Sequence, residues 1–249
     1  MSKPVRPIKR LPTADAYNQW ADVYDHDGNI LQLQDDEAFN ATVPGLLSTR
    51  PPSRILDLGC GTGRHTAKLY RLLPEATEIV AMDMSEGMMS KAKARIDTEP
   101  RRDVKITWVL HDIEADSQIP QEARGVDAVV CTLVMEHLRL DVFFGAVKEA
   151  LKKGGWMYLT NMHPEQGLSS RAGFVAKEGD QEVKIQGVSF NHSIEGILKA
   201  AREVGLRLLG EVEERGVDNA EHAQQLGKRA EKWIGIKMHA AMAFCLDLD

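Results

Sequence analysis

The sequence lacks the features that mark secreted, membrane-spanning and disulfide-stabilised proteins. Only three of its 249 residues are cysteines, namely Cys60, Cys131 and Cys245, and no two of them form a C-x-x-C pair. Neither a disulfide framework nor a zinc site is therefore predicted, and a reduced, cytoplasmic location is expected. No apolar run approaches the roughly 18 residues that span a bilayer. Basic residues in the first ten positions are not followed by the apolar stretch of a secretory signal.

A surplus of positive charge is also missing. The formal net charge is −6, with 31 Lys and Arg against 37 Asp and Glu. Proteins that bind nucleic acids generally need a basic surplus to neutralise phosphates, so that function class is disfavoured. The length, with 43% hydrophobic residues, suffices for one large domain or two small ones with a buried core.

Residues 1–52 are predicted to form a helical cover. Apolar and aromatic residues recur at helical spacing after Thr13, and Gly28-Asn29 interrupts the pattern. A second helix is predicted from Asp35 toward Leu47, and Pro51-Pro52 ends it.

Residues 53–161 are predicted to form a doubly wound α/β core. Short apolar runs alternate there with helical patterns, which is typical of a parallel sheet covered on both faces. The predicted strands are 54–58, 78–83, 104–110, 126–131 and 155–161, and the predicted helices are 63–73, 86–96 and 141–151.

The remaining residues are predicted to complete one domain, 1–249, with a Rossmann-like sheet of seven strands. A small lid insertion at 162–192 contains a hairpin turn at Glu178-Gly179-Asp180. Residues 193–249 supply a helix capped by Ser193 and two strands, 206–212 and 233–246, separated by a charged segment. The last strand is expected to pair antiparallel, because no long crossover helix precedes it.

The segment Asp57-Leu58-Gly59-Cys60-Gly61-Thr62-Gly63 carries the most functional information. A strand that runs into alternating glycines predicts close approach of the backbone to a ligand. The spacing is G-x-G-x-G, with Arg64 where a dinucleotide fingerprint has its third glycine, and no G-K-[ST] of a P-loop follows. Asp57 is better placed beside a cation than beside a pyrophosphate.

Asp83 closes the second predicted strand, 20 residues after Gly63. A carboxylate at this position can accept hydrogen bonds from both hydroxyls of a ribose. The residue fits a dinucleotide as well as another nucleoside, so it does not decide between them.

Taken together, these motifs resemble the class I S-adenosylmethionine-dependent methyltransferases. The resemblance covers about residues 17–161 and includes Asp57–Gly63, Asp83, His111-Asp112-Ile113 and Val134-Met135-Glu136-His137-Leu138. It is strongest to the ubiquinone and menaquinone methyltransferase branch. Tyr24-Asp25-x-Asp27-Gly28-Asn29 and Asn161-Met162-His163-Pro164 are similar to fungal secondary-metabolite members, some of which S-methylate dithiols of the gliotoxin type.

The resemblance implies a set of cofactor contacts. Asp57 would hold the ammonium group directly or through the loop, Asp83 would bind the ribose, and Asp112 and Ile113 would contact the adenine. Met84 and Met88 would pack against the adenine, Leu133 would line the wall near the methyl group, and Trp20 and Tyr24, with Tyr17, would cover the cofactor. The loop residues Gly59, Cys60, Gly61, Thr62 and Gly63 would line the methionine part. Ordinary core packing is the alternative for the aromatic residues and for the methionines.

The acceptor is expected to be a small, neutral or apolar metabolite. Motifs of DNA and RNA methyltransferases are missing after residue 131, and no carboxylate cluster predicts a metal site. His137 and His163 are the candidate catalytic residues, since histidine is the usual base near neutral pH. A dithiol would need no strong base, because a thiol is partly ionised near neutrality. O- or C-methylation of a quinol or phenol, a nicotinamide oxidoreductase and a non-catalytic cofactor-binding protein remain alternatives, and the oligomeric state is open.

Overall fold

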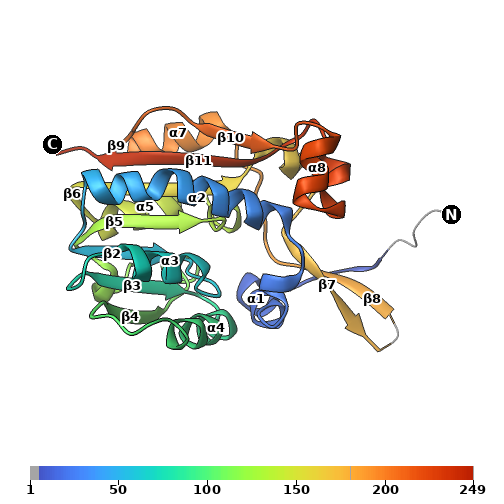
Figure 1. Cartoon of the computed structure of the whole chain (residues 1–249), viewed down its shortest axis with the longest axis horizontal. Coiled ribbons are helices and arrows are strands. Elements are labelled where there is room, and N and C mark those ends of the chain that lie inside the picture. The colour runs from blue at the N-terminus through green and yellow to red at the C-terminus, as the bar shows by residue number, and fades with distance from the viewer. Residues whose placement is uncertain (1–5, 180, 249) are drawn as a thin grey trace.

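A mixed sheet of eight strands forms the centre of the computed structural model, which describes residues 6–179 and 181–248 (Figure 1). The strand order is β10-β11-β6-β5-β2-β3-β4, and β9 also pairs with β11. The strands are β2 (Arg54–Leu58), β3 (Glu78–Asp83), β4 (Lys105–Leu110), β5 (Val126–Thr132), β6 (Leu151–Met162), β9 (Leu206–Leu208), β10 (Glu213–Gly216) and β11 (Lys237–Leu246). Neighbouring strands are parallel throughout the series β6-β5-β2-β3-β4. Strand β11 is antiparallel to β6, as predicted.

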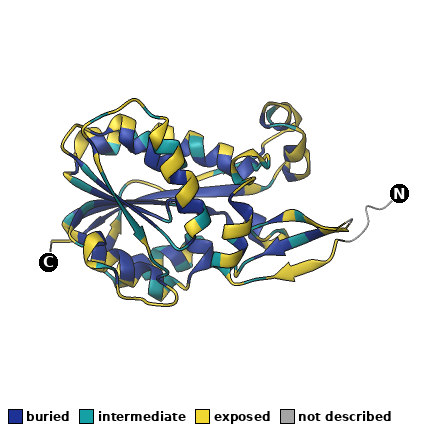
Figure 2. Ribbon diagram, turned by 90° about the horizontal axis from the view of Figure 1, so that it is seen from below, coloured by how far each residue is buried: buried dark blue, intermediate teal, exposed yellow. Residues whose placement is uncertain are grey.

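Helices cover both faces of the sheet. On one face lie α5 (Leu140–Ala150) and α7 (Ile194–Glu203), and on the other lie α2 (Ile30–Thr49), α3 (Arg64–Leu72) and α4 (Glu86–Asp97). Successive strand residues serve opposite layers: Ile55 packs with α2 and α3, whereas Leu56 packs with α5. The sheet is accordingly the most deeply buried part of the molecule (Figure 2). Alternating burial of this kind confirms the predicted doubly wound arrangement.

The predicted strand 206–212 is too long, because β9 ends at Leu208 and β10 begins only at Glu213. Gly210, with φ +76°, lies in the interruption, and β9 and β10 both run antiparallel to β11 and pair with different parts of it. The two share one edge position, and the sheet therefore keeps the seven positions that were predicted. Residues 233–236 precede β11 instead of belonging to it.

The N-terminal helices differ from the expected cover. Helix α1 (Thr13–Trp20) begins where predicted, but α2 begins at Ile30, where the Asn29 side chain accepts a hydrogen bond from Leu31 N. Since α2 packs along the sheet, it is a structural layer. Helix α1, the short 3-10 helix after it and the first residues of α2 lie near the carboxyl ends of the strands (Figure 1).

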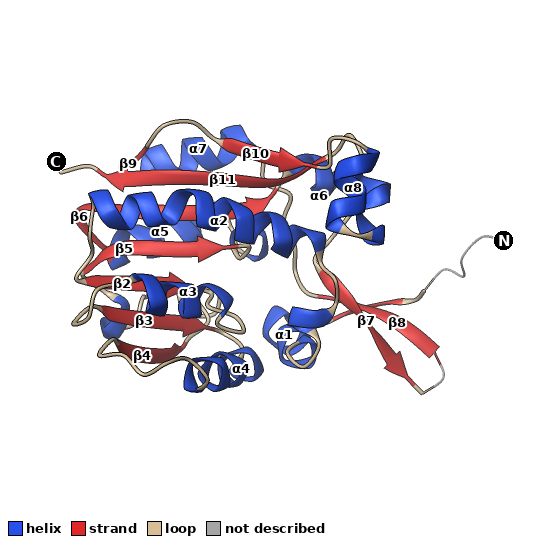
Figure 3. Ribbon diagram, viewed as in Figure 1, coloured by secondary structure: helices blue, strands red, loops and turns tan. Residues whose placement is uncertain are grey.

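A second, three-stranded sheet lies beside this edge, with order β1-β8-β7 (Figure 3). The hairpin β7 (Gly173–Glu178) and β8 (Gln181–Gln186) was predicted, although Asp180 of its turn lies outside the described residues. Strand β1 (Ile8–Arg10), helix α6 (Pro164–Ser169), helix α8 (Ala220–Leu226) and the 3-10 helix Lys228–Trp233 were not predicted. Among the described residues no helix is long and apolar enough to cross a membrane.

Candidate active site

A cavity of about 310 Å³ opens at the carboxyl ends of β2, β3, β4 and β5. The chain order of the strands reverses between β2 and β5, and open α/β sheets bind ligands at such a point. This first cavity falls in the size range of about 300–1,000 Å³ that is usual for small-molecule sites. Its lining includes ten of the predicted site residues, namely Tyr17, Tyr24, Gly59, Gly61, Asp83, Met84, Met88, Asp112, Ile113 and Leu133, and also His137.

The glycine loop meets this cavity through two of its three glycines. Gly59 has φ +73°, and a Cβ there would lie 2.2 Å from Cγ2 of Val134, so a side chain cannot be accommodated. At Gly61, with φ +54°, a Cβ would meet nothing within 4 Å, because this glycine faces the open cavity. The backbone is thus exposed to a ligand at Gly61 and tightly packed behind it at Gly59.

Asp83 is held rigidly at the end of β3. Its Oδ2 accepts a hydrogen bond from Gly61 N at 2.8 Å, and its Oδ1 accepts one from Ser85 N at 2.8 Å. Burial raises the pKa of this carboxyl, while the backbone donors act in the opposite direction. Each carboxylate oxygen retains further acceptor capacity, so both hydroxyls of a ribose fit this group.

Four predicted loop residues do not line the first cavity. Asp57 is buried, accepts a hydrogen bond from Thr66 Oγ1 at 2.5 Å, and has its pKa raised to about 7 by burial. Cys60 is buried, Thr62 donates to Asp25 Oδ1 at 2.7 Å, and Gly63 precedes α3 as its N-cap. Cys60, Thr62 and Gly63 were expected to line the methionine part, but they do not line the first cavity. For Asp57 the indirect role through the loop stays a prediction.

The aromatic residues of α1 and the turn after it face two cavities. Tyr17 and Tyr24 line the first cavity and also a second, adjoining one. Trp20 lines only the second, where its indole stacks on Phe174 with ring centroids 5.3 Å apart and Nε1 donates to Asp27 Oδ2 at 3.1 Å. Trp20 was expected to cover the cofactor, but it does not line the first cavity, because its ring stacks on Phe174 of β7.

His137 lies between the first cavity and α1. Its Nδ1 must donate to the Val188 carbonyl at 2.5 Å, so Nε2 accepts a hydrogen bond from Tyr17 Oη at 2.8 Å. Burial lowers the pKa of His137 and raises that of Tyr17, which keeps both groups neutral. Tyr17, hydrogen-bonded to His137, lines both the first cavity and the adjoining second one, so its phenol lies where the two cavities meet.

The second cavity, of about 110 Å³, shares Tyr17, Tyr24 and Leu133 with the first. Leu133 has φ +56°, a strained conformation for a branched residue, and it forms the wall between the two spaces. The remaining lining differs in character from the expected apolar pocket, because it includes Glu136, Gln166, Asp27, Arg171, Arg229 and Lys232.

His163 was, with His137, a candidate catalytic residue in the acceptor pocket. It lines neither of the two cavities. Its Nδ1 accepts a hydrogen bond from Glu165 N at 3.2 Å as the cap of α6, and its Nε2 contacts Glu214 Oε1 at 2.6 Å. Both ring nitrogens therefore serve the local structure.

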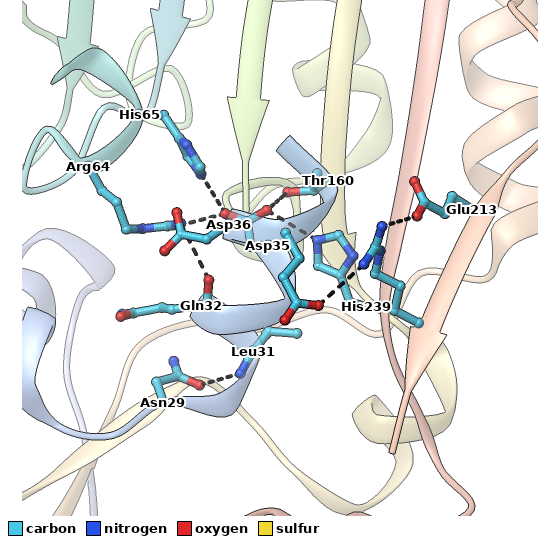
Figure 4. Close-up of polar contacts among 12 residues, drawn as sticks. Asn29, Leu31, Gln32, Asp35, Asp36, Arg64, His65, Thr160, Glu213 and His239 are labelled. Carbon is cyan, nitrogen blue, oxygen red and sulfur yellow. Dashed lines mark hydrogen bonds and ion pairs between the residues drawn. The ribbon is translucent and has the colours of Figure 1, made fainter. Parts of the chain in front are cut away.

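A buried polar cluster behind the glycine loop was not predicted (Figure 4). Asp35 of α2 is fully buried and accepts hydrogen bonds on both oxygens. Oδ2 contacts Arg64 Nη2 at 2.5 Å and His65 Nε2 at 2.7 Å, and Oδ1 contacts Thr160 Oγ1 at 2.6 Å and His239 Nε2 at 3.1 Å. Asp35 thus joins α2, the start of α3, β6 and β11 directly beneath the site.

The comparisons with known proteins agree with this architecture. A family model described as a methyltransferase domain matches residues 55–155. An uncharacterized methyltransferase of Emericella nidulans is 33% identical over 258 aligned positions, which cover 92% of this chain and 89% of the relative. The chain belongs to the methyltransferase family.

Solved structures show the same fold. A methyltransferase from Clostridium acetobutylicum that is described as S-adenosylmethionine-dependent matches with a TM-score of 0.61 and 17% identity, covering 93% of this chain and 99% of that one. DhpI, solved with S-adenosylhomocysteine, matches with a TM-score of 0.60 and 16% identity over 95% and 96% of the two chains. The Rossmann-like methyltransferase fold is confirmed.

Glu136 is the site residue that the motif analysis quoted without assigning it a role. It stands in the otherwise apolar run Leu133-Val134-Met135-Glu136, directly after β5. A carboxylate in an apolar run at the ligand edge of a strand is a signal for a buried functional group. Asp35 gave no comparable signal, because it begins an acidic triplet that reads as a solvated helix start.

Proposed function

We propose that this methyltransferase transfers a methyl group to a small-molecule acceptor that occupies the second cavity. The observation that supports this is the junction: Tyr17, Tyr24 and Leu133 line both spaces, so a donor in the first cavity and an acceptor in the second would meet there. A volume of about 110 Å³ suits a small metabolite better than a polymer end. We propose that residues 1–249 act as one unit, in the reducing cytoplasm that three buried, free cysteines suit.

The donor side is proposed as follows. Asp83 accepts the ribose hydroxyls, Asp112 and Ile113 contact the adenine, and Met84 and Met88 pack against it. All five line the first cavity. When bound there, S-adenosylmethionine supplies an electrophilic methyl group on a sulfonium. The faces of Tyr17 and Tyr24 suit a positive charge at the junction.

The chain's own contribution to the transfer is positioning. In-line displacement from a sulfonium needs alignment and exclusion of water more than covalent help. Leu133 and the hydrogen-bonded pair Tyr17 and His137 form the walls at which the acceptor atom would be held. Because His137 is neutral and its Nε2 is occupied by Tyr17, the phenol is the group that the acceptor would contact.

The charged lining of the second cavity favours a polar acceptor over an apolar dithiol or quinol. S-methylation of a dithiol and O- or C-methylation of a quinol therefore rank below transfer to a polar heteroatom, although the resemblance to fungal enzymes keeps them in the test.

The test is incubation with methyl-labelled S-adenosylmethionine and a metabolite extract, supplemented in separate arms with a reduced dithiol and with a quinol. Label in a small-molecule product, and its loss in Asp83→Asn, would support the proposal. Label only in protein or nucleic acid, or no label in any arm, would contradict it.

A further inference from the structure

We propose that the acceptor is a small organic acid that also carries an amino or hydroxyl group, and that this amino or hydroxyl group is the one methylated. This inference rests on the proposed function, since it assigns the acceptor chemistry of the second cavity. It differs from the sequence-based expectation of a neutral or apolar metabolite. The carrying observation is the arrangement of charge and of unpartnered oxygens in that cavity.

Cationic side chains stand at the mouth of the second cavity. Arg171, Arg229 and Lys232 all line it, and all three are exposed residues. They come from the segment after α6 and from the 3-10 helix Lys228–Trp233, so folding gathers them from distant parts of the chain. In a protein with a net charge of −6, this concentration of positive charge is a local exception that attracts an anionic group.

The two guanidinium groups are positioned by carbonyls. Arg171 Nη1 donates to the carbonyl oxygens of Gly167 and Ser170, and Arg229 Nη1 donates to that of Asp27. Within residues 6–179 and 181–248, neither arginine forms an ion pair with a carboxylate, although the charge of Arg229 opposes the rise that burial causes in the pKa of Asp27. Carbonyl contacts fix the orientation of a guanidinium without neutralising it, so its remaining donors can bind a carboxylate.

Unpartnered oxygens line the inner part of the same cavity. Oε2 of Glu136, Oε1 of Gln166 and Oδ1 of Asp27 are buried, and none has a hydrogen-bond partner among the described residues. Glu136 is 3% exposed and Gln166 is 7% exposed. A buried acceptor without a partner costs about 1–3 kcal/mol, which a bound molecule with N–H or O–H groups would recover.

The two features together define the ligand. Oxygens at the inner wall require donors, and guanidinium groups at the mouth require an anion. A small amino acid or hydroxy acid satisfies both at once: its N–H or O–H faces Glu136 near the junction, and its carboxylate faces Arg171 and Arg229. An apolar dithiol carries no anion for the guanidinium groups and offers only weak S–H donors to the oxygens.

Glu136 can also take up the proton that the acceptor loses when it is methylated. The acceptor's nitrogen or oxygen gives a lone pair to the methyl carbon supplied by S-adenosylmethionine, while the electrons of the broken sulfur–carbon bond stay on sulfur. The proton of the acceptor passes to Oε2 of Glu136 and then to solvent. Burial raises the pKa of Glu136 to about 7, which is suited to a group that takes up and releases a proton near neutrality.

The experiment separates a metabolite extract by anion exchange into a retained, anionic pool and an unretained pool, and offers each pool to the protein with labelled S-adenosylmethionine. Label is expected in the retained pool. It should fall at least tenfold in the double variant Arg171→Met and Arg229→Met, and persist in the control Arg202→Met, which changes an exposed arginine of α7. Transfer should also fall at least tenfold in Glu136→Gln but not in Glu203→Gln.

The affinity for S-adenosylhomocysteine, measured by calorimetry, serves as the second readout. It should be the same in wild type, Glu136→Gln and the double arginine variant, which shows that the proteins are folded and that the first cavity is intact. Label that arises from the unretained pool, or full transfer by the double arginine variant, would overturn this inference while leaving the proposed function standing. Label in neither pool would overturn both.

Discussion

Two buried carboxyl groups, Asp35 and Glu136, have opposite surroundings. Asp35 accepts hydrogen bonds from four side chains. Glu136 has an Oε2 without a partner among the described residues. Burial works against ionisation of both carboxyl groups. The pKa of Asp35 nevertheless lies well below its usual range, because His239 and His65 donate hydrogen bonds to it and Arg64 lies beside it. The pKa of Glu136 rises to about 7.

The difference shows how buried polar groups of a fold divide their roles. A carboxylate whose acceptor capacity is filled by its own chain holds structure together, since the donors to Asp35 come from three elements, α3, β6 and β11. A carboxyl group left without a partner costs stability, and such a cost is tolerated where a ligand removes it. Asp35 is therefore a structural centre, and Glu136 is the group that we propose binds the acceptor.

The largest effect is expected for Asp35→Ala. Removing the carboxylate leaves Arg64 with only the partly exposed Asp36 as a counter-charge. The buried His65, Thr160 and His239 also lose their acceptor, so the free energy of unfolding should fall by about 3–5 kcal/mol. Urea denaturation measures this loss. The control is Asp36→Ala, which removes a partly exposed partner of the same arginine and should cost about 1 kcal/mol or less. Equal losses in both variants would contradict the structural role of Asp35.

Next in size is the effect of Asp83→Asn on the first cavity. One oxygen of the carboxylate becomes an NH₂ group that cannot accept from a hydroxyl and that opposes the backbone donors, so affinity for S-adenosylhomocysteine should fall about 100-fold, or roughly 2.7 kcal/mol. Calorimetric titration checks it, with Glu86→Gln on the exposed first turn of α4 as the control. Unchanged affinity would remove Asp83 from the cofactor site.

A smaller effect is expected for Tyr17→Phe at the junction. The ring remains, but His137 Nε2 loses its donor and the acceptor loses the phenol, so kcat should fall about tenfold while the affinity for S-adenosylhomocysteine stays within about twofold. Tyr70→Phe, which removes a part-buried hydroxyl far from the site, is the matched control. A loss of cofactor affinity without a loss of kcat would place Tyr17 in the first cavity alone.

The smallest effect is a difference in the pH dependence of stability. The pKa of Glu136 in the folded protein is about 7, above the ordinary value of 4.5. The contribution of Glu136 to the free energy of unfolding is therefore fully present below pH 4.5 and is lost as the pH rises through about 7. Glu136→Gln should therefore become more stable relative to wild type between pH 5 and 8. For Asp35 the shift has the opposite sign, and its contribution is lost only as the pH falls below the ordinary value of 3.8.

Chemical denaturation at pH 5, 6, 7 and 8 distinguishes these two behaviours. The deficit of Asp35→Asn should be constant over that range, because both its native and its unfolded pKa lie below it. A deficit that varies for Asp35→Asn, or a constant difference for Glu136→Gln, would mean that the two carboxyl groups do not differ in the way described.

The sequence predicts the sheet core well because its strands are buried on both faces and its helices carry local signals. Ser193 caps α7 as expected, and the side chain accepts from Gly196 N at 3.0 Å. Strand β1 could not be predicted, because its three residues are exposed and pair with β8, more than 170 residues away. Helix α8 was not predicted, because it lies in a segment rich in charged residues. The Asn219 side chain caps its start by accepting a hydrogen bond from His222 N.

The site was predictable where contacts run through the backbone or lie at strand ends, as at Gly59, Gly61 and Asp83. It was not predictable where the role depends on which face of an element a side chain takes. Trp20 stacks on Phe174 and does not line the first cavity. Both ring nitrogens of His163 already form hydrogen bonds, one with Glu214 and one in the cap of α6. The second cavity is assembled from four separate segments, and no local pattern encodes that.

The central claim is that the donor lies in the first cavity and the acceptor in the second, with the transfer at their junction. A crystal structure of this protein with S-adenosylhomocysteine tests it most directly. The account predicts the ribose hydroxyls on Asp83 and the sulfur atom facing Tyr17 and Leu133, toward the second cavity. A sulfur atom directed away from Leu133, or a ligand outside the first cavity, would contradict it.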